Sequence, residues 1–166
     1  MISIHIVGRK NNGKTTLIVE LLNELKNRGL RVGTLKHSGH VHELDKPGKD
    51  SFQHREAGGN PAVVATKNQV AVFLPRAPDE DPFKNVTPLF EETDLVLVEG
   101  YIMGPGIKVE VWRKEKGNTP LMFERNDIRA VITNDDIDTD FPVWPRNEIN
   151  KIADNICSLA GLNLIE

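Results

Sequence analysis

The sequence predicts an α/β fold with a mostly parallel sheet flanked by helices and an added antiparallel strand excursion. An apolar, β-branched run at 2–7 is typical of a buried strand, and a helical pattern ending at Gly29 separates it from a second strand at 30–36. Two strands joined by one short helix form a parallel βαβ unit, which starts a doubly wound sheet. The near-continuous apolar run at 93–100 then suits a central parallel strand covered on both faces.

Apolar periodicity and turn residues predict the other elements in chain order. These are a polar loop, a short helix, a hairpin of two strands, a short amphipathic helix, three further strands and a closing helix: residues 37–48, 49–57, 61–66 with 69–74, 86–92, 107–113, 129–134, 143–144 and 147–160. The sequence contains no evident repeat, low-complexity segment or linker, and its length suits one well-packed domain. We therefore expect a single domain over residues 1–166.

The segment between the first strand and the first helix matches the phosphate-loop pattern G-x-x-x-x-G-K-[ST] at every fixed position. Gly8 and Gly13 let backbone N–H groups turn toward an anion, and the helix that starts near Lys14 adds its positive dipole end. Lys14 is expected to reach the β- and γ-phosphates and Thr15 to ligate Mg²⁺. The order strand, loop, helix predicts a P-loop NTPase fold. The candidate nucleotide-binding residues are Gly8, Lys10, Asn11, Asn12, Gly13, Lys14, Thr15 and Thr16.

Besides the hydroxyl of Thr15, a carboxylate is expected near the metal of a phosphate loop, and Glu99 fits this role. It is the last residue of the apolar strand LVLVE and is followed by a glycine. A carboxylate in such a place is costly unless a cation or hydrogen-bond donors compensate it, which favours a Mg²⁺ or Mg²⁺-water ligand over a solvated strand end. Asp45 and Asp50 are further candidate acids on the Mg²⁺ side.

The polar loop at 36–51 is the second concentration of functional side chains, and it follows the strand after the first helix, where P-loop proteins sense the γ-phosphate and metal. Its candidate switch or substrate residues are Lys36, His37, His40, Lys49 and Asp50. The histidines at 37, 40 and 42 also suggest a metal site, but the sequence has no cysteine pair or outlying ligand of the right spacing. Neutral donors toward an anionic ligand, or ordinary loop histidines, are the alternatives.

The segment at 130–136 is similar to the strand-end N-K-x-D element that reads guanine, with Asn134 and Asp136 as its candidate residues. An aspartate there accepts hydrogen bonds from the N1–H and N2–H₂ groups of guanine, a pattern that adenine does not offer. The lysine is absent and the spacing is degenerate, so an acidic turn after a strand is an equal alternative. Pro145-Arg146-Asn147 is a further candidate to border the base.

Composition limits the classes of function. A net charge of −3 gives no general basic field, so we expect no duplex nucleic acid partner. A single cysteine, Cys157, excludes an intramolecular disulfide and a CxxC metal site. The chain has no apolar run of membrane-spanning length and begins directly in a strand without a signal-peptide pattern. We therefore expect a cytoplasmic protein with no membrane partner.

The blocks GRKNNGKTT, LKHSGHVHELDKPGKDSFQHREAG, DLVLVEGY and IKVEVWR together resemble the molybdopterin-guanine dinucleotide biosynthesis protein B (MobB) family. The block KH-x-GH-x-H-x-x-D-x-x-GKDS is much rarer than a phosphate loop alone. Residues 9–12 are more polar and basic than the small residues expected inside this loop.

The resemblance implies a GTP-binding accessory protein with weak GTPase activity. It implies a homodimer that assists a MobA-type guanylyltransferase in attaching GMP to molybdopterin, which forms the guanine dinucleotide cofactor. Residues 8–16 would bind phosphates, and Thr15, Asp45 and Glu99 would lie at Mg²⁺. The 36–51 loop would face the nucleotide and the pterin phosphate, and 99–123 would supply extra strands and part of the dimer interface.

Two other functions use the same loop. A small-molecule kinase needs arginines over the transferred phosphoryl group, but Arg55, Arg76 and Arg125 are widely scattered. A nickel-inserting GTPase is suggested by the histidines and weakened by the missing cysteine motif. No catalytic glutamine or arginine finger is evident, so we assign no catalytic residue and expect slow turnover in isolation.

Overall fold

The computed structural model describes residues 1–162, and the chain divides into two compact units. The larger unit consists of Met1–Ser38 and the chain from Val86 onward, and the smaller unit is Gly39–Asn85. The expectation of a single domain over residues 1–166 stays a prediction. None of the helices between residues 1 and 162 is long and apolar enough to cross a membrane.

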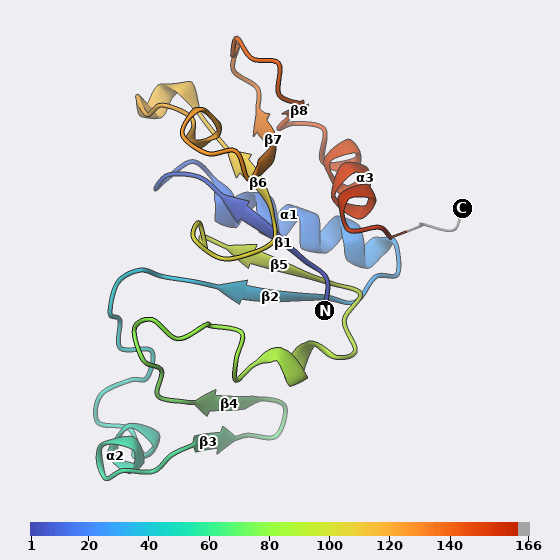
Figure 1. Ribbon diagram of the computed structural model, residues 1–166. Helices are drawn as coiled ribbons and strands as arrows, with labels where there is room; N and C mark the ends of the chain where they lie inside the picture. The colour runs from blue at the N-terminus through green and yellow to red at the C-terminus, as the bar shows by residue number, and fades with distance from the viewer. Residues whose placement is uncertain (163–166) are drawn as a thin grey trace. The chain divides into compact units, whose positions relative to one another are not determined.

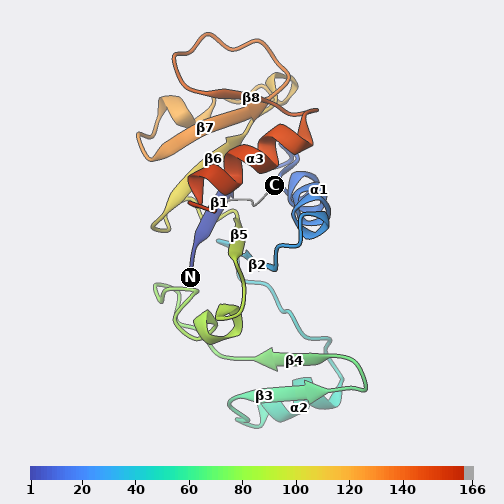
Figure 2. The same ribbon diagram turned by 90° about the vertical axis from the view of Figure 1, so that its right-hand side faces the viewer.

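The larger unit is built on a six-stranded sheet with the order β2-β5-β1-β6-β7-β8, in which every neighbouring pair is parallel. Its strands are β1 Ser3–Val7, β2 Val32–Lys36, β5 Leu95–Glu99, β6 Ile107–Val111, β7 Ile128–Thr133 and β8 Val143–Pro145. Two helices, α1 Lys14–Asn27 and α3 Ile149–Leu159, pack together on one face of this sheet (Figures 1 and 2). The predicted parallel sheet flanked by helices is confirmed.

The helix-facing side of the sheet forms the main hydrophobic core. Ile4 and Ile6 of β1 are fully buried there, together with the apolar stripe of α1 and the inward residues of α3. Helix α1 ends at Asn27, and Gly29, just beyond its C-cap residue Arg28, has a φ of 80° that only glycine adopts easily. The N–H of Gly29 bonds to Lys26 O at 2.9 Å and that of Leu30 to Leu25 O at 3.1 Å, which is a Schellman motif. The predicted helix end is confirmed.

The smaller unit contains the short helix α2, Asp50–Glu56, and an antiparallel pair of strands, β3 Ala62–Ala65 and β4 Val70–Phe73. Thr66 N–H donates to Gln69 O at 2.8 Å and closes the hairpin at the predicted turn. The added antiparallel strands of the predicted fold are therefore these two.

Two elements differ from the sequence-based prediction. The expected helix at 86–92 is only a 3₁₀-helix, η1 Thr87–Phe90. Leu89 N–H bonds to Val86 O at 3.0 Å and Thr93 N–H to Phe90 O at 3.1 Å, which is the three-residue spacing of a 3₁₀-helix. The segment 99–123, for which the resemblance implied extra strands, supplies one strand, β6, which joins the parallel sheet between β1 and β7. The remainder of this segment forms loops and two 3₁₀-helices, η2 Lys114–Lys116 and η3 Leu121–Phe123.

Strand β6 carries two charged residues, Lys108 and Glu110, on the face opposite Val109 and Val111, and both are buried. The carboxylate of Glu110 accepts hydrogen bonds from the N–H groups of Leu121 at 2.8 Å and Met122 at 2.9 Å, and so caps the start of η3. Burial raises the pKa of Glu110. The ammonium of Lys108, only 2% exposed, lies 2.9 Å from the Asp127 carboxylate. These contacts satisfy charges that would otherwise destabilise the sheet.

Replacing Asp127 with Asn should lower the free energy of unfolding by about 2 kcal/mol, measured by urea titration. The change removes the negative charge beside the buried Lys108 ammonium, which is then left with neutral acceptors such as the Gly106 carbonyl, 3.4 Å away. The loss should be smaller than the roughly 3–5 kcal/mol of a fully buried pair, because the Asp127 side chain is 38% exposed. An Asp140→Asn variant, at an exposed position, is the control, and an equal effect of both changes would contradict this role.

The effect of Asp127→Asn should depend on pH. The hydrogen bond from Arg125, and after it the interaction with Lys108, hold the pKa of Asp127 well below its usual range. A carboxyl whose pKa is lowered in the folded state contributes its full stabilisation of the fold at pH values above its unfolded pKa of about 3.9. This contribution is lost as the pH falls from there toward the folded-state pKa. The stability gap between the wild type and the variant should therefore be full at pH 7 and shrink below about pH 4.

Candidate nucleotide-binding site

The phosphate loop joins β1 to α1 through residues in left-handed conformations. Gly8, Asn11 and Gly13 have φ values of 140°, 66° and 91°. A Cβ atom on Gly8 would collide with the carbonyl oxygen of Val111 on the neighbouring strand, so only glycine fits there. The motif's first glycine is thus required by the packing of β1 against β6.

The ammonium of Lys14 closes this loop by bonding to its carbonyls. The Nζ atom donates to the oxygens of Gly8 and Arg9, each at 2.9 Å. Burial lowers the pKa of Lys14, while the charge of Glu99 raises it and that of Lys36 lowers it. A phosphate group carries a negative charge that a neutral carbonyl lacks, so it adds Coulomb attraction and is a better partner for this ammonium than the two carbonyls.

The side chains of the loop residues face different surroundings. Lys10, Asn11, Thr15 and Thr16 are exposed, whereas Asn12 is fully buried. Among residues 1–162, neither polar atom of the Asn12 amide has a hydrogen-bond partner. The side chain of Asn12 is therefore enclosed by protein, and its backbone N–H donates to the Arg9 carbonyl at 3.4 Å inside the loop. The predicted role of Asn12 in nucleotide binding stays a prediction.

The side chain of Arg9, also in this loop, contacts the segment between β6 and β7. Its Nε atom donates to the Thr119 carbonyl at 3.2 Å, and its guanidinium forms an ion pair with Glu124. The unexpectedly basic residue at this position thus connects the phosphate loop to the segment between β6 and β7.

Thr15 and Glu99, which were both predicted as metal ligands, lie in contact. The Thr15 hydroxyl donates to Glu99 Oε1 at 2.7 Å, and Lys36 Nζ lies 3.4 Å from the same oxygen. Strand register explains the meeting, because Glu99 of β5 is aligned with Ile6 of β1 and with Lys36 of β2. A hydroxyl and a carboxylate are the hard oxygen donors that Mg²⁺ prefers, so this pair fits the ion.

Tyr101 is a site residue that sequence reasoning missed. Its ring stacks on that of His37 with the centroids 4.5 Å apart, and His37 N–H donates to the Glu99 carbonyl at 2.9 Å. Tyr101 thereby fastens the end of β2 to the end of β5. The only signal in the sequence is its place two residues after the acid, beyond Gly100 with its φ of 80°.

The other predicted residues of the 36–51 loop belong to the smaller unit. Asp45 Oδ1 accepts hydrogen bonds from Ser51 Oγ at 3.1 Å and from Lys46 N–H at 2.8 Å. His40 lies edge-on to His42, with 6.0 Å between ring centroids. Within residues 1–162, no group of three or more His, Cys, Asp or Glu side chains is arranged to hold a metal ion. The proposed roles of Asp45, His40, Lys49 and Asp50 stay predictions.

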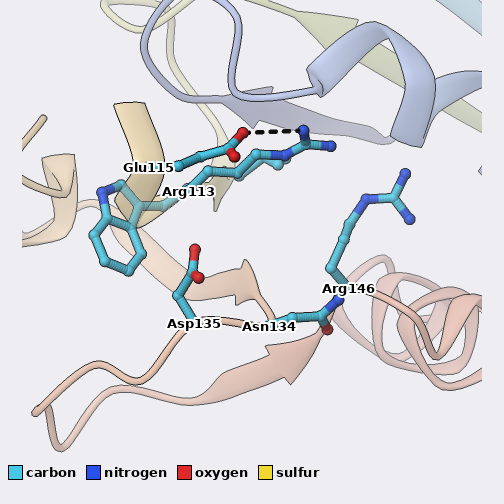
Figure 3. A pocket seen from close by; sticks show the side chains of 7 residues that line it. Arg113, Glu115, Asn134, Asp135 and Arg146 are labelled. Atoms are coloured by element: carbon cyan, nitrogen blue, oxygen red, sulfur yellow. Dashed lines mark ion pairs between the residues drawn. The ribbon is translucent and has the colours of Figure 1, made fainter. Parts of the chain in front are cut away.

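A pocket of about 250 Å³ opens at the carboxyl ends of β6, β7 and β8 (Figure 3). Its lining residues are Val111, Trp112, Arg113, Glu115, Asn134, Asp135 and Arg146. The structure thus brings the predicted Asn134 to this pocket together with Asp135, while Asp136 is exposed and outside the lining. Sequence reasoning did not select Asp135, because only the turn after β7 determines which of the two acids faces inward.

The pocket borders the phosphate loop through Arg113. A Cβ atom built on Gly13 would lie only 2.9 Å from Nη2 of this arginine. On the other side, Arg146 is fixed by an ion pair of 2.6 Å with Glu20 of α1. Both arginines therefore connect the pocket to the elements that form the phosphate site.

Comparison with known proteins agrees with this geometry. The family model of Molybdopterin guanine dinucleotide synthesis protein B (MobB) matches residues 3–134. The chain is 36% identical over 153 residues to a molybdopterin-guanine dinucleotide biosynthesis adapter protein of Haemophilus influenzae, covering 91% of this chain and 85% of that protein. It is 34% identical over 148 residues to the protein of the same name from Escherichia coli, covering 86% and 83%.

Solved structures show the same fold. The crystal structure of Bacillus subtilis MobB superposes with a TM-score of 0.73 at 25% identity, covering 96% of this chain and 98% of that one. A crystal structure of molybdopterin-guanine biosynthesis protein B superposes with a TM-score of 0.73 at 27% identity, covering 95% and 99%. The phosphate-loop fold, the family match and these relatives together show that the chain belongs to the MobB family.

Proposed function

We propose that this protein binds GTP with Mg²⁺ and acts as an accessory protein with weak GTPase activity in molybdenum cofactor biosynthesis. In this role it assists the attachment of GMP to molybdopterin, which forms the guanine dinucleotide cofactor. The observation that carries the proposal is the cluster in which Lys14 closes the phosphate loop while Thr15 and Glu99 meet at 2.7 Å beside it. Membership of the MobB family supports the pathway.

The proposed partner is a MobA-type guanylyltransferase, because the relatives from Haemophilus influenzae and Escherichia coli are named adapter proteins. An adapter has to contact another protein. The family name refers to the synthesis of molybdopterin guanine dinucleotide, and the enzyme that adds GMP carries out that step. A homodimer, a cytoplasmic location and contact with molybdopterin complete the proposal and rest on the family resemblance.

The arginines that a kinase would need are engaged locally. Arg55 pairs with Glu43 at 2.8 Å, Arg76 donates to the carbonyl of Glu80 at 3.0 Å, and Arg125 pairs with Asp127 at 2.7 Å. None of these contacts involves the phosphate loop. The structure thus offers no observation that favours phosphoryl transfer to a small molecule over GTP binding.

Replacing Lys14 with Ala should weaken Mg²⁺-GTP binding at least about 100-fold, as measured by calorimetry, because the ammonium that reaches the β- and γ-phosphates is lost. The fold should persist, since the bonds of Lys14 go only to loop carbonyls. Lys26→Ala is the matched control, because it removes an exposed lysine at the far end of the same helix. GTP affinity that is equal in both variants would contradict the site.

Replacing Glu99 with Gln should weaken GTP binding about tenfold in the presence of Mg²⁺ and leave it unchanged in EDTA. The amide oxygen can still accept the hydrogen bond from Thr15, but it lacks the charge that holds the ion. The measurement is a GTP titration at a series of Mg²⁺ concentrations, with the exposed Glu91→Gln as the control. Unaltered metal dependence in the Glu99 variant would remove this residue from the metal site.

A further inference from the structure

We propose that the pocket between the ends of β6, β7 and β8 is the base-specificity site for guanine, with Asp135 as its acceptor and Arg113 and Arg146 as its donors. The inference rests on the proposed function, since it requires the phosphates to lie in the neighbouring loop. It replaces the sequence-predicted pair, Asn134 and Asp136, by Asp135 and Arg113, and it keeps Arg146, which the sequence suggested as a border of the base.

The position of the pocket suits the base of a nucleotide held by the phosphate loop. Strands β1, β6, β7 and β8 are parallel neighbours, so their carboxyl ends lie along one edge of the sheet. Ligands of open α/β sheets bind at this edge. The volume of about 250 Å³ is below the roughly 300–1,000 Å³ of pockets that hold a whole drug-sized ligand, which suits one part of a nucleotide.

Asp135 is held so that its carboxylate can serve as an acceptor. Its Oδ2 atom accepts from the Lys114 N–H at 2.7 Å, and its own N–H donates to the Thr133 hydroxyl at 3.0 Å. Figure 3 shows the carboxylate pointing toward the Arg113 side chain across the pocket. A carboxylate has about four lone-pair positions, so one bond from Lys114 leaves acceptors for the N1–H and N2–H₂ groups of guanine.

The two arginines supply donors on the remaining sides. The Arg113 side chain is 41% exposed, and its ion pair with Glu115 is long, at 3.7 Å, so a ligand can compete for its guanidinium. Arg146 is only 15% exposed, and its buried Nε atom has no acceptor within residues 1–162. A guanidinium pairs with the O6 and N7 acceptors of guanine or stacks on the ring.

This combination distinguishes guanine from adenine. Guanine presents two adjacent donors to a carboxylate and two acceptors to a guanidinium, whereas adenine would place the lone pair of its N1 atom against the carboxylate. The strand end after β7 lacks the lysine of the N-K-x-D element, and Arg113 supplies a cation from the adjacent strand instead. Because Arg113 also lies against Gly13, the base pocket and the phosphate loop share one side chain.

The deciding variant is Asp135→Asn, tested by calorimetry with GTP, ATP and xanthosine triphosphate. The amide oxygen can keep the bond from Lys114 N–H, so the turn should stay folded while the NH₂ group faces the pocket. Xanthine carries a carbonyl where guanine carries its amino group, and this carbonyl can accept from the amide. We expect GTP affinity to fall at least about tenfold and xanthosine triphosphate to become the preferred ligand.

Four further variants complete the test. Asp138→Asn, at an exposed position on the same loop, should leave the preference for GTP unchanged. Arg113→Met should bring the GTP to ATP affinity ratio toward one, and Arg113→Lys should restore part of it. A switch to xanthosine triphosphate in Asp136→Asn, or an unchanged GTP preference in Asp135→Asn, would overturn the assignment.

Lys14→Ala separates failure of this inference from failure of the proposed function. If the wild type binds GTP and ATP equally and Lys14→Ala abolishes both, the pocket does not select the base although the phosphate loop binds nucleotides. If Lys14→Ala leaves the binding of every nucleotide unchanged, the proposed function itself fails.

Discussion

The parallel pairing of β5 with both β1 and β2 is the constraint on which the site depends. It aligns Glu99 with Ile6, just before the phosphate loop, and with Lys36 at the end of β2. The apolar residues of β5 are close-packed on both faces of the strand. A slip of one residue would exchange the positions of its leucines and valines and turn Glu99 to the other face of the sheet. Packing and the placement of this acid therefore fix the register, and the register brings the carboxylate to the Thr15 hydroxyl.

The charged side chains around the phosphate loop are paired with groups of the protein itself. Lys14 uses two backbone carbonyls, and Glu99 is shared by the Thr15 hydroxyl and the Lys36 ammonium. Each partner is weaker than the one that Mg²⁺ and a polyphosphate would supply. In the proposed function, Mg²⁺ and a polyphosphate would replace these internal partners, and the strands that position the residues would stay in place.

The sequence predicts the parts of this fold that depend on local patterns, which are the phosphate loop, its flanking elements and the hairpin of the smaller unit. It does not predict features that depend on distant partners. Apolar and charged residues alternate over 107–111, a pattern typical of a half-exposed strand. Lys108 is nevertheless buried, because the Asp127 carboxylate pairs with its ammonium. The positions of Tyr101 and Arg113 likewise depend on which strands lie next to each other in the sheet. The local spacing of apolar residues does not predict this order. The inward position of Asp135 depends on the turn after β7.

The most direct test is a crystal structure of this protein with Mg²⁺ and a non-hydrolysable GTP analogue. We expect Lys14 Nζ to leave the carbonyls of Gly8 and Arg9 for the β- and γ-phosphates, and Mg²⁺ to lie between the Thr15 hydroxyl and Glu99. Lys14 still bonded to both carbonyls, with the nucleotide bound elsewhere on the protein, would contradict this expectation.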